Sequence, residues 1–298
     1  MAEPSRDNDF RFCDAHVHFY DMGHPTLHYA HWQPDEDHPV LGPQTRKLGQ
    51  RNYLAEDYLA ESAPHGTVKC VHVQAAIGSK DPVDETEWLQ AAKERTGAPN
   101  SIVGYVDLSE PDAERQLERH LQFPAFKGVR DFAEGRTDYL MSDEFRRGFA
   151  LLGKHGLVSS IAAQWQEMEK VADLARSFPD TAIVLDHTGL PTERTPEYFQ
   201  QWRRALATLS EAENVVCKIS GLGMFDQAWT VDSIRPYVEA AIELFGPRRA
   251  LFATNWPIDS LWSSYETVVG SYRDITAALS ADERQQLFAA TTERLYDI

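Results

Sequence analysis

Short β-rich runs alternate with helical stretches along most of the chain, and this alternation restricts the fold more than any other feature. Eight runs are expected to be strands: Phe10–Phe19, Thr67–Ile77, Ser101–Asp107, Ala125–Arg130, Leu157–Ala163, Ala182–Asp186, Val215–Ser220 and Ala250–Thr254. Eight short buried strands alternating with helices in 298 residues predict an α/β fold, a single-domain (β/α)8 TIM barrel spanning residues 1–298. An open doubly wound sheet is the alternative, but no Gly-x-Gly-x-x-Gly motif follows the first strand.

One long segment, residues 21–64, interrupts the alternation between the first two expected strands. It contains four histidines (His24, His28, His31 and His38), Trp32, and one helical piece near residues 52–61. Because a long loop inside a compact domain often carries function, we expect a loop insertion after strand 1 that caps the barrel mouth. A surface wrap or an oligomer contact is the alternative. The histidines are too irregularly spaced to predict a metal site.

Composition narrows the class of partner. The chain has 46 acidic and 29 basic residues and a net charge of −17, which argues against nucleic-acid binding. It has no apolar run of the roughly 18 residues that a membrane helix needs, and its start lacks the apolar core of a signal peptide. Three scattered cysteines in apolar runs, Cys13, Cys70 and Cys217, predict buried thiols and a reducing, cytoplasmic environment. We expect a small-molecule substrate and leave a homo-oligomer open.

The motif Asp14-x-His16-x-His18 is the sharpest chemical signal in the chain. In a strand, residues i and i+2 point to the same face, so His16 and His18 are expected to lie side by side. Two imidazoles on one face can bind a metal or share proton-transfer work. The alternative is two histidines that are each satisfied by local hydrogen bonds. Asp14 is expected to orient its neighbours.

The other expected strands also end in polar side chains, and the active site of a TIM barrel lies at those ends. Arg130 could hold a substrate carboxylate with two hydrogen bonds; an ion pair with Asp131 or Glu134 is the alternative. His187 is expected at the site, and Gln74, Gln164 and Trp256 are further candidates for substrate binding. The strand-end residues, read in order, are His72, Gln74, Arg130, Gln164, Trp165, Asp186, His187, Lys218, Ser220, Asn255, Trp256 and Asp259.

Five motifs, in this order along the chain, resemble the amidohydrolase superfamily. They are Asp14–His18, Phe126–Arg130, Leu185–Pro191, Cys217–Leu222 and Phe252–Pro257. The set is similar to the amidohydrolase-2 type and its lactonase branch, which includes L-fuconolactonase and 2-pyrone-4,6-dicarboxylate lactonase. The resemblance implies a TIM-barrel hydrolase in which an activated water attacks the carbonyl carbon of a lactone, carboxylated or sugar-derived. Amide hydrolysis or decarboxylation is the alternative within the superfamily.

Two departures from the family pattern affect the expected metal. Asn255 stands where members with a strong site carry Asp, and Gln164 stands where many carry His. His16, His18 and His187 are sufficient in number for zinc, so we expect a weak divalent-metal site, with metal-free catalysis also open. Asp259 is expected either to serve as the general base or to cap a helix. The missing ligands also leave open a non-catalytic binding or oligomer-forming barrel.

Overall fold

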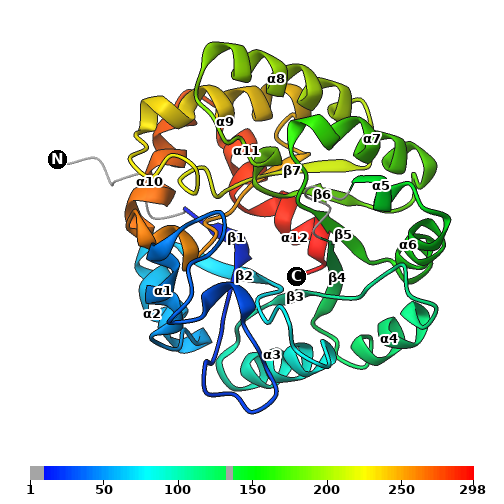
Figure 1. Cartoon of the computed structure of the whole chain (residues 1–298). Coiled ribbons are helices and arrows are strands. Elements are labelled where there is room, and N and C mark those ends of the chain that lie inside the picture. The colour runs from blue at the N-terminus through cyan, green and yellow to red at the C-terminus, as the bar shows by residue number, and fades with distance from the viewer. Residues whose placement is uncertain (1–9, 132–136) are drawn as a thin grey trace.

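The computed structural model describes residues 10–131 and 137–298, and it shows a barrel of parallel strands inside a ring of helices (Figure 1). Hydrogen bonds join the strands in chain order from the first to the eighth. A parallel bridge between Val17 and Trp256 brings the last strand beside the first. The strands are β1 (Phe12–Val17), β2 (Thr67–Val73), β3 (Ser101–Gly104), β4 (Phe126–Asp131), β5 (Val158–Ile161), β6 (Ile183–Leu185), β7 (Val215–Ile219) and β8 (Ala250–Phe252). The predicted fold is confirmed.

Helix α6 (Asp143–His155) begins and ends with typical capping residues. Ser142 caps α6 by accepting a hydrogen bond from the Phe145 amide, and Gly156 ends that helix in the left-handed conformation. The helices are α1 (Arg46–Gly49), α2 (Ala55–Ser62), α3 (Val83–Thr96), α4 (Ala113–His120), α5 (Thr137–Leu140), α6 (Asp143–His155), α7 (Met168–Ser177), α8 (Pro196–Ser210), α9 (Val231–Phe245), α10 (Tyr265–Ile275), α11 (Ala281–Gln285) and α12 (Thr291–Tyr296). None of these helices, all within residues 10–131 and 137–298, is long and apolar enough to cross a membrane.

The barrel interior changes from apolar to polar toward the carboxyl ends of the strands. An apolar cluster fills its lower part: Ala15, Val71, Val73, Val103, Val158, Val184, Val216, Leu251, Ala253 and Tyr296. Because alternate residues share a face, the next inward positions on β5, β6 and β7 lie two residues beyond Val158, Val184 and Val216, and Arg130 of β4 lies beside them. Those positions hold Arg130, Ser160, Asp186 and Lys218, all buried. The residues that carry charge therefore lie as one layer directly beneath the barrel mouth.

Asp14 joins the first strand to the last one and to two helices. Its carboxylate accepts hydrogen bonds from the Thr254 amide (2.9 Å) and hydroxyl, and from the hydroxyls of Tyr58 and Tyr265 (3.1 Å each). Burial raises the pKa of this fully buried carboxyl to about 6, although the hydrogen bonds favour its charged form. Asp14 thus has the orienting role expected from the sequence, and it closes the barrel below the histidines.

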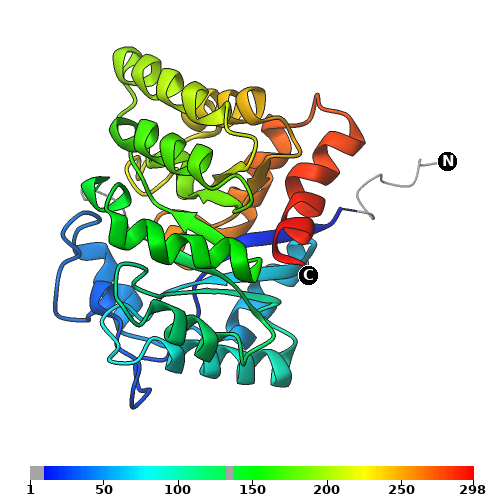
Figure 2. The ribbon, with the colours of Figure 1, turned by 90° about the vertical axis from the view of Figure 1, so that its right-hand side faces the viewer.

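Segment 21–64 lies at the mouth end of the barrel, whereas α12 and the chain's carboxyl end lie at the opposite end (Figure 2). Its backbone pairs with the strand ends at Tyr20–Tyr53 and Tyr29–Gly78. Short 3-10 turns at Ala30–Trp32 and Pro43–Thr45 precede α1 and α2, and the helix expected near residues 52–61 is α2. The segment is therefore ordered backbone beside the site, with its apolar side chains packed into the main core.

Candidate active site

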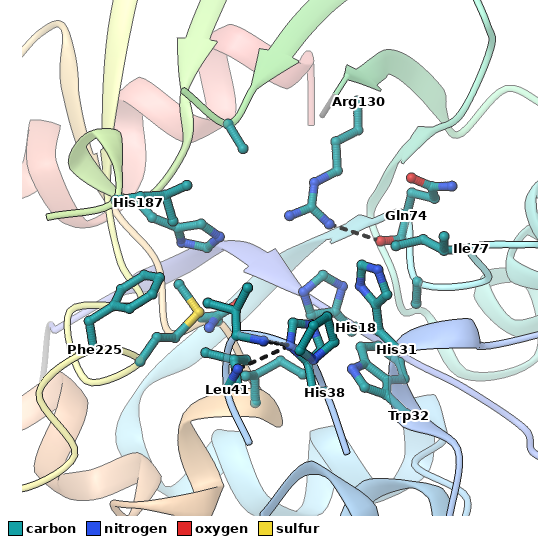
Figure 3. Close-up of a pocket in the computed structure, with 18 residues that line it drawn as sticks. His18, His31, Trp32, His38, Leu41, Gln74, Ile77, Arg130, His187 and Phe225 are labelled. Atoms are coloured by element: carbon teal, nitrogen blue, oxygen red, sulfur yellow. Dashed lines mark hydrogen bonds between the residues drawn. The ribbon is translucent and has the colours of Figure 1, made fainter. Parts of the chain in front are cut away.

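A cavity of about 280 Å³ opens at the carboxyl ends of the strands (Figure 3). Four residues predicted from strand ends line it together with His18: Gln74, Arg130, His187 and Asn255. Segment 21–64 contributes the wall that includes His31, Trp32, His38 and Leu41. The expected convergence of strands one, two, four, six and eight is observed. That segment 21–64 caps the barrel mouth stays a prediction.

His16 and His18 form the middle of a directed hydrogen-bond chain beneath the cavity. The Nδ1 atom of His18 lies 2.7 Å from the carbonyl oxygen of Val73, which only accepts, so Nδ1 carries the proton. The Nε2 atom of His18 then accepts from Nε2 of His16 at 3.1 Å. This leaves Nδ1 of His16 to accept from the Lys218 ammonium at 3.4 Å. The chain of contacts fixes one tautomer for each ring.

Asp186 holds the two buried cations below the imidazoles. Its Oδ1 atom accepts from Lys218 Nζ and from the Ser160 hydroxyl, each at 2.8 Å, and its Oδ2 atom lies 3.6 Å from Nε of Arg130. Burial alone would raise the pKa of Asp186, but the charges of Lys218 and Arg130 hold it well below its usual range. Burial lowers the pKa of Lys218, and Asp186 opposes that shift. Asp186 and Lys218 thus each stabilise the charged form of the other.

His187 sits in a short turn of left-handed backbone after β6. Its φ is 53°, Thr188 has φ 52° and Leu190 has φ 50°, a conformation that non-glycine residues rarely adopt. The indole of Trp202 donates to the Thr188 carbonyl oxygen at 2.7 Å and so supports the turn. The Nδ1 atom of His187 lies 2.8 Å from the Ser220 hydroxyl, which orients the ring into the cavity. Burial lowers the pKa of His187 to about 3, so the ring is neutral near pH 7.

The turn after β2, which holds Arg130, is itself held by the buried pair His72 and Glu85. The sequence predicts a position at the site for His72 but not for Glu85. Nη1 of Arg130 donates to the Gln74 carbonyl oxygen at 3.1 Å. Glu85, from α3, accepts hydrogen bonds from the amides of Ala75 (2.8 Å) and Ala76 (2.9 Å) and faces His72 Nε2 at 3.3 Å. His72 was recognised as a strand-end residue. No local pattern marks Glu85, since its role depends on how α3 packs against β2.

Asn255 lines the cavity, whereas Asp259 lies behind it. Asn255 has φ 58°, and its side-chain amide donates to Oδ1 of Asp259 at 3.0 Å. Asp259 is only 4% exposed, and burial raises the pKa of its carboxyl to about 7. Among the described hydrogen bonds, its side chain caps no helix. Its role as the general base stays a prediction.

Two candidates for substrate binding, Trp256 and Gln164, are not among the described residues that line the cavity. The Trp256 indole donates to Oε2 of Glu61 in α2 at 2.8 Å, and its ring packs against Tyr265. The backbone amide of Gln164 donates to the Glu167 carboxylate at 3.0 Å, at the start of a 3-10 turn. Neither residue belongs to the part of the cavity wall that the structure describes. The alternative partners expected for Arg130 were Asp131 and Glu134; Glu134 and the Asp131 side chain lie outside the described residues. Among the described residues, Asp186 places a carboxylate beside the Arg130 guanidinium.

Comparison with known proteins fits this barrel and its strand-end residues. Residues 13–298 match the family described as amidohydrolase. The chain belongs to the amidohydrolase family. It is 38% identical over 302 residues to protein y4mH of Sinorhizobium fredii, an uncharacterized protein, covering 98% of this chain and 100% of that one. It is 30% identical over 263 residues to L-fucono-1,5-lactonase of Burkholderia multivorans, covering 82% and 87%.

A solved amidohydrolase from Burkholderia multivorans superposes with a TM-score of 0.84 at 25% identity, covering 97% of this chain and 100% of that one. That crystal structure contains bound zinc. The resemblance to the lactonase branch is therefore confirmed, and the chain is an enzyme of the amidohydrolase superfamily that is lactonase-like. Because that relative binds zinc, we compare the geometry of His16, His18 and His187 in this chain with the geometry that a zinc ion requires.

The amidohydrolase site fits a zinc ion only in part. Two imidazole nitrogens bound to one tetrahedral zinc, at about 2.0–2.1 Å each, lie about 3.3 Å apart, close to the 3.1 Å between the Nε2 atoms of His16 and His18. However, Lys218 beside Nδ1 of His16 favours the tautomer that carries its proton on Nε2, the nitrogen that would bind. The rings of His16 and His187 lie 4.5 Å apart between centroids, yet in residues 10–131 and 137–298 no group of three His, Cys, Asp or Glu is arranged to hold an ion. As arranged, the residues do not make a three-ligand site, and the zinc ligands His16, His18 and His187 stay a prediction.

Proposed function

We propose that this amidohydrolase hydrolyses a lactone in the cavity at the barrel mouth. The observation that carries the proposal is the meeting of neutral imidazoles and one guanidinium at a buried, concave site: His18, His187 and Arg130 line the same cavity. Ester hydrolysis needs a group that accepts a proton from water and a group that stabilises the negative oxygen of the tetrahedral intermediate. The L-fucono-1,5-lactonase relative supports a lactone over an amide.

We assign the proton-accepting role to His187 and the electrostatic role to Arg130. When Nδ1 of His187 donates to the Ser220 hydroxyl, its second ring nitrogen has a lone pair that can take a proton from water. Arg130, held by Gln74 and Asp186, places a fixed positive charge in the same cavity. It can stabilise the developing oxyanion or hold an anionic group of the substrate. His16, which Lys218 contacts, orients the His18 ring beside these two residues.

Turnover of a panel of lactones, linear esters and amides tests the proposal. We expect lactone turnover by the wild type and a loss of about 100-fold or more in kcat for His187→Gln, in line with general-base removal. His155→Gln, on the outer helix α6, is the matched control and should keep full activity. Since the pKa of His187 is about 3, the activity assigned to it should show no loss between pH 8 and pH 5. Turnover of none of these compounds would contradict the function and favour a binding protein.

For the metal, we propose weak, substoichiometric zinc binding by His16 and His18, with His187 as the third candidate. When bound, zinc would polarise a carbonyl oxygen or activate water. The partial fit of the imidazole pair supports weak binding, because a charged third ligand is absent among the described residues. Metal analysis of the purified protein before and after dialysis against a chelator, with activity measured at each stage, tests this. The three buried free thiols support a cytoplasmic location.

A further inference from the structure

We infer that the substrate of this site has an apolar body attached to the hydrolysed ring, in contrast to a polyhydroxylated sugar lactone. The inference rests on the proposed lactone hydrolysis and specifies its substrate class. It comes from the distribution of side chains around the cavity, where polar groups occupy the floor and apolar groups occupy most of the outer wall. Figure 3 shows Phe225 and Leu41 on the side of the cavity that lies away from Arg130.

The outer wall is built by four segments that are far apart in the sequence. Segment 21–64 provides Leu41, the turn after β6 provides Leu190, and the loop after β7 provides Met224 and Phe225. Ile258, from the turn after β8, completes this wall. A sugar lactone presents a hydroxyl group on most of its ring carbons. Against this wall those hydroxyls would lose their hydrogen bonds to water, and each unpaired polar group costs roughly a factor of ten in binding.

Eight of the described residues that line the cavity have polar side chains, and several of these already have hydrogen-bond partners. None of them is Asp, Glu, Ser, Thr or Tyr, so the described wall lacks the carboxylates and hydroxyls that can bind sugar hydroxyls. His38 Nδ1 accepts from the amides of Val40 and Leu41 at 3.1 Å each. The Asn255 amide donates to Asp259. The permanent charge on this wall is the guanidinium of Arg130, so the ligand that fits best combines an apolar body with a neutral or anionic polar end.

A series of lactones with matched rings measures this preference. The probes are six-membered lactones that carry an alkyl chain of one to five carbons beside the ring oxygen, and a polyhydroxylated six-carbon 1,5-lactone. We expect kcat/KM to rise about fourfold for each added carbon until the cavity is filled, from about 0.8 kcal/mol per buried methylene. We expect the pentyl lactone to exceed the polyhydroxylated lactone by about 100-fold or more. A flat response to chain length, or a preference for the polyhydroxylated lactone, overturns the inference.

Variants at Phe225 show whether the wall is responsible. Phe225→Asn should flatten the dependence on chain length to less than twofold per carbon, whereas Phe225→Leu, which keeps an apolar side chain, should preserve it. Phe225 is partly exposed and packs at the edge of the core, so both variants should fold; far-ultraviolet circular dichroism and thermal melting verify this. Equal dependence in both variants would count against Phe225 as part of the specificity wall and overturn the inference.

Binding measurements separate this inference from the proposed function. The probes are straight-chain carboxylates from butanoate to octanoate and a polyhydroxylated six-carbon carboxylate, titrated calorimetrically into the wild type and into Phe225→Asn. No turnover is required. If no lactone is hydrolysed but affinity still rises three- to fourfold per carbon in the wild type and not in the variant, lactone hydrolysis is wrong and the apolar ligand class stands. If lactones are hydrolysed while affinity ignores chain length, the ligand class is wrong and the activity stands.

Discussion

Replacing Asp259 by Asn should stabilise the protein at neutral and alkaline pH. Burial raises the pKa of this carboxyl from its ordinary 3.8 to about 7, so the folded protein favours the protonated form. A raised folded-state pKa gives a contribution to stability that is fully present below about pH 4 and is lost as the pH rises toward 7. At 1.36 kcal/mol per pH unit, the loss amounts to about 4 kcal/mol. Asparagine keeps the acceptor for the Asn255 amide and does not ionise.

Urea unfolding of the wild type and Asp259→Asn at pH 4, 6 and 8 measures this difference. We expect nearly equal free energies of unfolding at pH 4, and an advantage for the variant that grows to between about 2 and 4 kcal/mol at pH 8. Asp14, whose pKa is also raised, is present in both proteins and cancels in the comparison. Asp274→Asn on α10, which removes an exposed carboxyl, serves as the matched surface control and should not show the growing advantage expected for Asp259→Asn.

The same variant separates three roles for Asp259. A general base predicts a loss of several orders of magnitude in kcat together with the pH-dependent gain in stability. A buried carboxyl that only supports Asn255 predicts the gain with activity kept within about tenfold. A helix cap predicts a loss of about 1 kcal/mol at every pH. A variant that is less stable than the wild type at pH 8 would refute the reasoning from burial.

Three further predictions concern the cavity. Arg130→Lys should raise KM for a carboxylated lactone about tenfold or more and change KM for an uncharged lactone little, because lysine keeps the charge but loses the planar fork; equal effects on both would contradict an anion-binding role. Gly221→Ala should abolish most activity, since a Cβ there would lie 2.7 Å from Nδ1 of His187. Gly246→Ala is the control: it has a similar φ but open space around it, and it should cost only about 1 kcal/mol of stability. Steady-state kinetics and thermal melting compare the two variants. Exchanging the amide and carboxylate in Asn255→Asp/Asp259→Asn should raise zinc retained after dialysis several-fold, as measured by metal analysis, and unchanged retention would show that the missing carboxylate does not limit binding.

The strands could be predicted from the sequence because each is a short apolar run that is buried on both faces in a parallel barrel. The ends were less predictable. The expected strand Phe10–Phe19 is Phe12–Val17, and Thr67–Ile77 ends at Val73, because the polar residues that follow leave the ladder and turn into the mouth. For the second strand that turn is fixed by Glu85, whose acceptor atoms hold the amides of Ala75 and Ala76. Nothing local to residues 67–77 encodes that partner.

The candidate site was predicted best where a side chain's direction follows from strand geometry. His16 and His18 lie side by side, and Arg130 points inward two residues above Gly128, as alternation requires. Prediction was poorer for residues in the turns beyond the strands. Trp256 is only one residue past Asn255, yet it turns away to Glu61 while Asn255, in the left-handed conformation, faces the cavity. Turn geometry of this kind depends on contacts with other segments, such as α2.

The charged side chains of this barrel lie mostly below the imidazoles, and their position influences the protonation of the histidines at the mouth. Asp186 neutralises one of two buried cations, Lys218 beneath the cavity and Arg130 on its wall, and Asp14 supplies a second buried carboxyl below the histidines. Burial, assisted by the two cations, lowers the pKa of His16, His18 and His187, so all three imidazoles stay neutral near pH 7. A neutral imidazole can accept or donate a proton without first releasing one to solvent. Lys218 therefore acts on the cavity without reaching it. It favours the His16 tautomer in which Nε2 donates to Nε2 of His18, while the Val73 carbonyl oxygen accepts from Nδ1 of His18.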